Sequence, residues 1–120
     1  MRKFIRSLGY ACSGIQYALR TQRHMRIHTA AAVIVIFLGL IARLTVTRWA
    51  ILLLTIGSVI SAEMMNTAVE QVVNLASPSL HPLAKRAKDV AAGAVLIVSA
   101  AAVVIGVIVL LPPIWELLFQ

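Results

Sequence analysis

Two carboxylates and a carboxamide lie close together inside an apolar stretch of the chain. Glu63, Asn66 and Glu70 continue a hydrophobic run that begins at Trp49. At about 100° per residue, these three side chains fall within roughly 60° of one another on a helix, with Thr67 nearby. Ionisable groups inside a membrane are costly and usually functional. These side chains form a polar stripe along the predicted helix. The stripe suits a cation site or a proton-transfer site, and the alternative is a polar seam that only fixes helix packing.

The depth of this stripe favours chemistry at a membrane surface. At about 1.5 Å per residue, Glu63 lies roughly 21 Å from Trp49, within roughly 9 Å of the far boundary of a hydrocarbon layer about 30 Å thick. Carboxylate and amide oxygens suit Mg²⁺, and a partly desolvated Glu63 suits a general base. We expect charged residues from the starts of two other spans at the same boundary. They are Arg23, Arg26, Lys85, Arg86, Lys88 and Asp89.

These groups are the parts that phosphoryl transfer requires, because acids hold the metal and basic side chains neutralise phosphate oxygens. The chain contains no GxxxxGK[ST] loop and no glycine-rich kinase loop. Any nucleotide site must therefore be built from helix side chains.

Composition places the chain in a membrane. Of its 120 residues, 61% are hydrophobic and 12% are charged, whereas soluble domains contain about 25% charged residues. The net charge is +7, and the basic residues cluster beside apolar spans, which favours lipid headgroups or phosphates over nucleic acid. Cys12 is the only cysteine, so no internal disulfide is possible.

Helical periodicity predicts an all-α integral membrane protein with a single domain over residues 1–120. An amphipathic helix over about residues 2–20 is expected to lie in the membrane surface. Three transmembrane spans are expected to follow, over about residues 25–44, 49–74 and 88–111. Ser77-Pro78-Ser79 should end the second span's helix, Pro82 should begin the next one, and Pro112-Pro113 should end the third.

The distribution of positive charge predicts the orientation. The N-terminal segment, up to Arg26, holds six Lys and Arg residues, and the connection over residues 77–89 holds three. The connection over residues 43–48 holds two, and the C-terminal tail holds none. By the positive-inside rule, the N-terminus and the Glu63 side of the second span are cytoplasmic in a bacterial inner membrane, and the C-terminus is outside.

The motifs also carry a resemblance. The pattern ExxNTAxE is present from Glu63 to Glu70, and HPLAKxAKDxAAGAV from His81 to Val95. Further matches are Gly9, Tyr10, Gly14, Ala18 and the RIH triplet Arg26-Ile27-His28. Without gaps, this sequence resembles the small prokaryotic diacylglycerol kinase family, particularly its undecaprenol kinase branch.

The resemblance implies a homotrimer with active sites between subunits, which transfers the γ-phosphate of ATP to a membrane lipid alcohol with Mg²⁺. It implies that Glu63 is the catalytic base and that Glu70 holds the metal. Asn66 and Thr67 would complete the polar part of the site. The nucleotide would be bound by Lys88, Asp89, His81, Arg26 and Tyr10.

Three positions depart from the family pattern. Gln22 stands where a metal-binding Glu is usual, and it can donate an oxygen but brings no charge. His24 stands where Asn is usual, and Asn74 where Asp closes the stripe. The substitutions leave open an enzyme with weakened metal affinity, or one that recruits its metal chiefly through ATP.

Several alternatives remain at this point. Undecaprenol is preferred over diacylglycerol as substrate because the NTA residues 66–68 and the HPLAK residues 81–85 look more like the undecaprenol kinase branch. A proton-coupled transporter that uses Glu63 and Glu70 as a relay does not explain the basic residues on the same side. A catalytically inactive lipid-binding homologue stays open because of Gln22 and Asn74. His24 and His28 share a helix face, but a zinc site needs further ligands.

Overall fold

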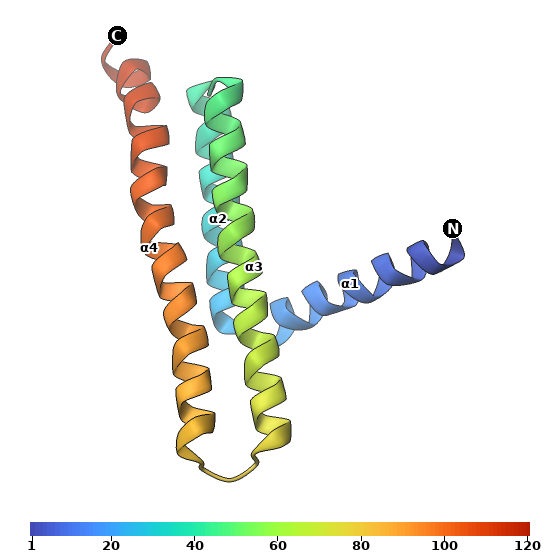
Figure 1. Ribbon diagram of the computed structural model, residues 1–120. Coiled ribbons are helices and arrows are strands. Elements are labelled where there is room, and N and C mark those ends of the chain that lie inside the picture. Colours follow the sequence, from blue (N-terminus) through green and yellow to red (C-terminus); the bar gives the residue numbers. More distant parts are fainter.

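The computed structural model describes all 120 residues as four helices (Figure 1). They are α1 (Arg2–Thr21), α2 (Arg23–Ala42), α3 (Val46–Ala76) and α4 (Pro82–Phe119). The last three are long and apolar enough to cross a membrane. In Figure 1, α2, α3 and α4 run side by side, and α1 projects away from them. The expectation of a surface helix followed by three spans is confirmed.

The lengths of the helices show which of them extend beyond a bilayer. With 20 residues, α2 is about 30 Å long, close to the thickness of the hydrocarbon layer. The 31 residues of α3 and the 38 residues of α4 correspond to about 46 and 57 Å. The connection over residues 77–81, at the bottom of Figure 1, therefore lies well beyond the start of α2 at Arg23.

The change of direction between α1 and α2 occurs at one residue. Gln22 ends α1 and precedes α2 with an extended backbone (φ −109°, ψ 116°). Arg26 Nη1 donates to the carbonyls of Leu19 and Arg20, at 3.2 and 3.0 Å. These carbonyls lack partners within their own helix, and a cation near a helix C-terminus is also favourable. Arg26 thus fixes α1 against the start of α2.

The apolar side of α1 is uncovered within the chain. Phe4, Ile5 and Leu8 are all at least half exposed, while Arg2 and Arg6 belong to the same helix. An amphipathic helix of this kind lies in a membrane interface with its basic residues toward the headgroups.

The turn between α2 and α3 is closed by local bonds and a close approach. Arg43 adopts a left-handed conformation (φ 52°), and its N–H bonds back to the end of α2. Thr45 then caps α3 by accepting a hydrogen bond from the Arg48 N–H at 3.3 Å. Gly39 lies against the indole of Trp49: a Cβ there would come within 2.8 Å of the Trp49 ring. A glycine is therefore required for this close packing.

The expectation that Pro112-Pro113 ends the third span's helix is wrong, because α4 continues through both prolines to Phe119. A proline inside a helix frees the carbonyl four residues earlier, here those of Ile108 and Val109. Arg48 Nη1 donates to both carbonyls, at 3.1 and 2.8 Å. A side chain from another helix therefore replaces the two hydrogen bonds that the prolines cannot make.

The best-packed part of the bundle surrounds this contact. A cluster of buried apolar side chains joins α2, α3, α4 and the first turn, and consists of Ala42, Leu44, Leu52, Val109 and Leu110. We call residues 39–52 together with 105–114 the Arg48 end of the bundle. Residues 22–28, 63–70 and 81–89 form the Glu63 end.

Candidate active site

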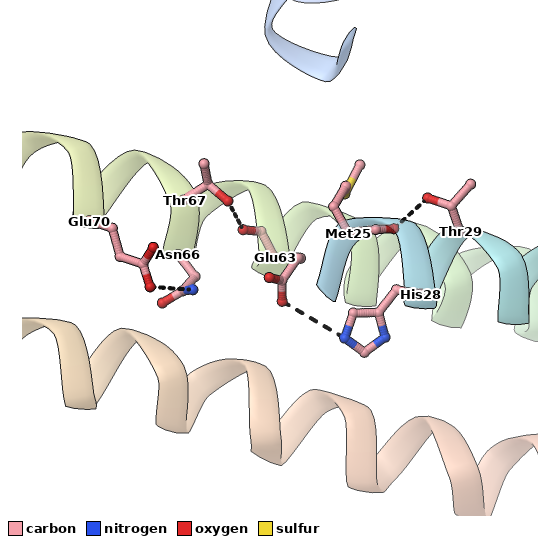
Figure 2. A network of polar contacts seen from close by, with 7 residues as sticks. All are labelled: Met25, His28, Thr29, Glu63, Asn66, Thr67 and Glu70. Carbon is pink, nitrogen blue, oxygen red and sulfur yellow. Dashed lines mark hydrogen bonds and ion pairs between the residues drawn. The ribbon is translucent and has the colours of Figure 1, made fainter. Parts of the chain in front are cut away.

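The stripe predicted on α3 divides between two sides of the helix. In Figure 2, Glu63, Asn66 and Glu70 project to one side, and Thr67 projects to the opposite side. Glu63 and Thr67 are the only buried polar residues, at 4% and 5% exposure. The Thr67 hydroxyl donates to the Glu63 carbonyl at 3.0 Å, within its own helix. The buried position of Glu63 shows that its carboxylate faces protein rather than acyl chains.

A histidine from α2 lies opposite Glu63. His28 Nε2 is 3.8 Å from Glu63 Oε2 (Figure 2). This is the only interaction between an acidic residue of α3 and a basic residue of another helix. His28 itself is half-buried. The imidazole is thus the nearest polar partner from another helix for the buried Glu63 carboxylate.

Asn66 and Glu70 form a second polar pair one turn further along α3. Asn66 Nδ2 donates to Glu70 Oε1 at 3.3 Å. This bond leaves Asn66 Oδ1 buried with no hydrogen-bond partner. A buried acceptor without a donor costs about 1–3 kcal/mol. An uncompensated oxygen beside a carboxylate is a donor set that fits a hard cation such as Mg²⁺.

Gln22 lies at the junction of α1 and α2 and is half-buried. Its Nε2 donates to Thr21 Oγ1 at 3.3 Å, and its Oε1 takes part in no hydrogen bond within the chain. Gln22 and Glu70 stand almost equally far along the chain from Thr45, on opposite sides of the turn between α2 and α3. Antiparallel helices rise equally per residue, so both residues lie at about the same level of the bundle.

The predicted nucleotide residues of α4 lie around its first turns. His81 caps the helix, with its Nδ1 accepting from the Leu83 N–H at 3.1 Å. Asp89 pairs with Lys85 on the same helix, and Lys88 is half-buried. Within one chain, neither Lys88 nor Asp89 makes a hydrogen bond or an ion pair with an acid of α3.

Lys88 of α4 lies opposite Glu70 of α3 in the antiparallel pair that these helices form. Glu70 precedes Ser79 by the same number of positions by which Lys88 follows it. The two are therefore at about the same level of an antiparallel pair. The remaining two predicted residues lie on the α1 side: Tyr10 is exposed on α1, and Arg26 uses its Nη1 to hold the end of α1.

The sequence prediction missed the pairing of His28 with Glu63. The pairing could have been found from the register of α2 against α3. His28 and Glu63 are almost equally distant from Thr45 along the chain, one before the turn and one after it. Two antiparallel helices joined by a tight turn place such residues side by side.

An apolar cavity leads to this pair from the Arg48 end. It has a volume of about 490 Å³ and lies between α2, α3 and α4. Of its 18 lining residues, 14 are hydrophobic. His28 and Ile60 line the end nearest Glu63, and Ile114 lines the other. The buried carboxylate therefore lies beside a space that suits a hydrocarbon chain.

Fold and site together define a small multi-pass membrane protein with buried acids close to a basic helix start. Comparison with known proteins identifies its family. The family model described as prokaryotic diacylglycerol kinase matches residues 9–110. The chain belongs to this family, and it is a lipid kinase.

Three relatives show the extent of the similarity. The chain is 40% identical to the undecaprenol kinase of Bacillus subtilis over 112 residues, which cover 93% of this chain and 91% of that protein. It is 47% identical to a diacylglycerol kinase of Synechocystis over 113 residues, which cover 93% of this chain but 65% of that longer protein. It is 28% identical to a diacylglycerol kinase of Helicobacter pylori over 96 residues, which cover 80% of this chain and 75% of the relative.

Proposed function

We propose that the protein phosphorylates undecaprenol with ATP and forms undecaprenyl phosphate. The observation that carries the proposal is the likeness to the Bacillus subtilis undecaprenol kinase, which extends over 91% of that protein. The NTA residues Asn66-Thr67-Ala68 and the HPLAK residues 81–85 support the same branch of the family. Residues 1–120 then constitute one membrane-embedded lipid kinase domain.

Glu63 is the base that takes the proton from the lipid hydroxyl. Its carboxylate is 4% exposed, and it lies beside the apolar cavity rather than on the outer face of the bundle. Removal of the proton lets the alcohol oxygen form its bond to the γ-phosphorus while the bond to the bridging oxygen of ADP breaks. General-base assistance of this kind contributes about 10²–10⁴ in rate.

Mg²⁺ is the implied metal, and the acids of α3 fit it. Glu70 and the uncompensated Asn66 Oδ1 would be the oxygen donors, and Gln22 lies at about the same level of the bundle. When bound, the metal neutralises charge on the phosphate oxygens. Gln22 brings no charge, so we expect this site to depend on ATP to bring part of the metal's coordination.

Lys88 and Asp89 bind the nucleotide together with His81, Arg26 and Tyr10. Their support is the position of Lys88 and Asp89 opposite Glu70 in the antiparallel register, together with the family motif. His81 uses only Nδ1 for its helix cap, which leaves Nε2 for a ligand. Lys88 supplies a positive charge for phosphate oxygens.

A homotrimer with active sites between subunits completes this arrangement. Most of the apolar surface of the three spans is exposed in the single chain, and further subunits would cover part of it. The N-terminus and the Glu63 end face the cytoplasm, where ATP is available, and the C-terminus lies outside. This orientation follows from the Lys and Arg residues that flank the Glu63 end.

Diacylglycerol is the second candidate substrate. The specific observation in its favour is the 47% identity to the Synechocystis diacylglycerol kinase, the higher of the two values. The product would be phosphatidic acid. The apolar cavity accepts an acyl chain as readily as a polyprenyl chain, so the two substrates must be separated by experiment.

The test is a competition between the two lipids. The purified protein is reconstituted into nanodiscs that contain equal amounts of undecaprenol and dioleoylglycerol, with labelled ATP and Mg²⁺. We expect labelled undecaprenyl phosphate to form at least about tenfold faster than labelled phosphatidic acid, which corresponds to about 1.4 kcal/mol of discrimination. A preference for the glycerolipid assigns the second function, and labelling of neither lipid identifies an inactive homologue.

A further inference from the structure

Glu63 is one of two buried polar residues in the chain, and no side chain within the chain donates a hydrogen bond to its carboxylate. The one polar group directed at it from another helix is the His28 imidazole, 3.8 Å away. A carboxylate removed from water needs a compensating donor or charge.

We propose that His28 is a positioning residue for Glu63. Its Nε2–H is directed to Glu63 Oε2 and fixes the orientation of the other carboxylate oxygen toward the lipid hydroxyl. This inference rests on the proposed role of Glu63 as the base. Nε2 carries a hydrogen in the charged imidazolium and in one neutral tautomer. The distance between the two atoms exceeds that of a hydrogen bond, and such contacts often tighten when substrate binds.

In the phosphoryl transfer, one bond to the γ-phosphorus forms and one breaks. The hydroxyl proton moves to Glu63, the alcohol oxygen bonds to the γ-phosphorus, and ADP leaves with the bridging oxygen. The proton returns from Glu63 to water after the products depart. His28 takes up no proton in this step and acts only through its contact with Glu63 Oε2. A second His at position 24 is exposed and has no contact with an acid.

The position of His28 in the lining of the apolar cavity also supports this role. Among the residues of α2 that line it, His28 is the one closest to the Glu63 end and the only one with a polar side chain. A lipid chain in this cavity would carry its terminal hydroxyl past the imidazole to the carboxylate. The histidine thus lies at the boundary between the hydrocarbon part of the substrate and the base.

The test compares substitutions that keep or remove a donor within reach of Glu63. H28Q retains an N–H donor on a side chain of similar length. H28N is too short to bring its N–H to the position of Nε2, and H28L has no donor, so both remove the contact with Glu63. We measure kcat and the KM for ATP in nanodiscs with the lipid that the wild type phosphorylates. T29V is the matched control, because Thr29 follows His28 on α2, does not line the cavity and donates only to the Met25 carbonyl of its own helix.

We expect H28L to lower kcat about 10- to 100-fold, with the KM for ATP within about twofold of wild type, and H28Q to recover most of the loss. T29V should keep the wild-type kcat. In the E63Q background, H28L should cause little further loss, because both changes remove the same action. H28N replaces H28L in the comparison with H28Q if the leucine variant does not fold.

Two results would overturn the inference while the proposed function stands: a wild-type kcat in H28L or H28N, or losses that multiply when H28L is combined with E63Q. Failure of the wild type to phosphorylate either lipid would instead remove the proposed function. A rise in the KM for ATP with unchanged kcat would place His28 in nucleotide binding and would also reject its role beside Glu63.

Discussion

The two ends of the bundle both contain polar side chains of α3, but they satisfy them differently. At the Arg48 end, the guanidinium donates to two carbonyls of α4 that the prolines have freed. At the Glu63 end, the carboxylate has one contact at 3.8 Å, and Asn66 Oδ1 has no partner. Buried polar groups are normally hydrogen-bonded, so each exception requires an explanation.

The difference indicates that the polar groups of the Arg48 end stabilise the fold, whereas those of the Glu63 end are available for catalysis. A polar group whose partners all belong to the same chain holds helices together and leaves nothing for a ligand. Groups that the chain leaves without partners have capacity for a metal, a nucleotide or a substrate hydroxyl. The buried apolar cluster lies at the Arg48 end, while the Glu63 end lacks one, and this is consistent with the separation.

The largest effect is expected at the Glu63 end. E63Q should lower kcat about 10²- to 10⁴-fold, because the amide cannot take the hydroxyl proton. The thermal unfolding temperature in detergent should change little, because the amide preserves the shape of the side chain. Steady-state kinetics and thermal unfolding check both parts. An unchanged kcat would show that Glu63 is not the base.

The opposite pattern is expected at the Arg48 end. R48A leaves the carbonyls of Ile108 and Val109 without donors, and we expect a loss of about 2–4 kcal/mol in the free energy of unfolding. Below the unfolding temperature, kcat should stay close to wild type. Unfolding by denaturant in mixed micelles gives the measurement.

A compensating variant tests the cause of this loss. R48L combined with P112A and P113A restores the helical N–H donors to the same carbonyls and should regain most of the stability. If the triple variant is as unstable as R48A, the bonds from Arg48 to α4 are not what stabilises this end.

A smaller effect is expected from completing the metal site. Q22E places a charged oxygen donor at the level of Glu70, and we expect the Mg²⁺ concentration for half-maximal activity to fall about 3- to 10-fold. Q16E on α1 adds the same charge away from the site and should leave the titration unchanged. Equal shifts in both variants would attribute the effect to net charge alone.

The smallest effect is expected at the turn before α3. Arg43 is the only residue with a positive φ, and R43G should stabilise the fold by up to about 1 kcal/mol. R43A removes the same charge without relieving the backbone, so it should not stabilise. Equal unfolding temperatures for the two variants would show that the left-handed conformation costs nothing here.

Most of the fold was predictable because it depends on local patterns. Apolar periodicity predicted the spans, and Ser77-Pro78-Ser79 and Pro82 marked the break and restart that the structure contains. The continuation of α4 through Pro112 and Pro113 was not predictable from that segment. It depends on Arg48, which belongs to a different helix and is far away from both prolines along the chain.

The arrangement of the polar side chains on α3 was predictable in part. Helical spacing placed Glu63, Asn66 and Glu70 on one side of the helix, as Figure 2 shows, but Thr67 projects to the opposite side. Spacing along one helix does not reveal which residue of another helix lies opposite. The pairing of His28 with Glu63 required the register of α2 against α3, which the short turn sets.

The contact between Arg48 and α4 has a consequence for how the protein is made. Arg48 precedes Ile108 and Val109 by 60 and 61 residues, so its guanidinium has no α4 carbonyls to bind until α4 has been synthesised. Until then, only α2 and α3 are available to line the cavity. We infer that the cavity beside Glu63 takes its shape only when α4 packs against the hairpin of α2 and α3.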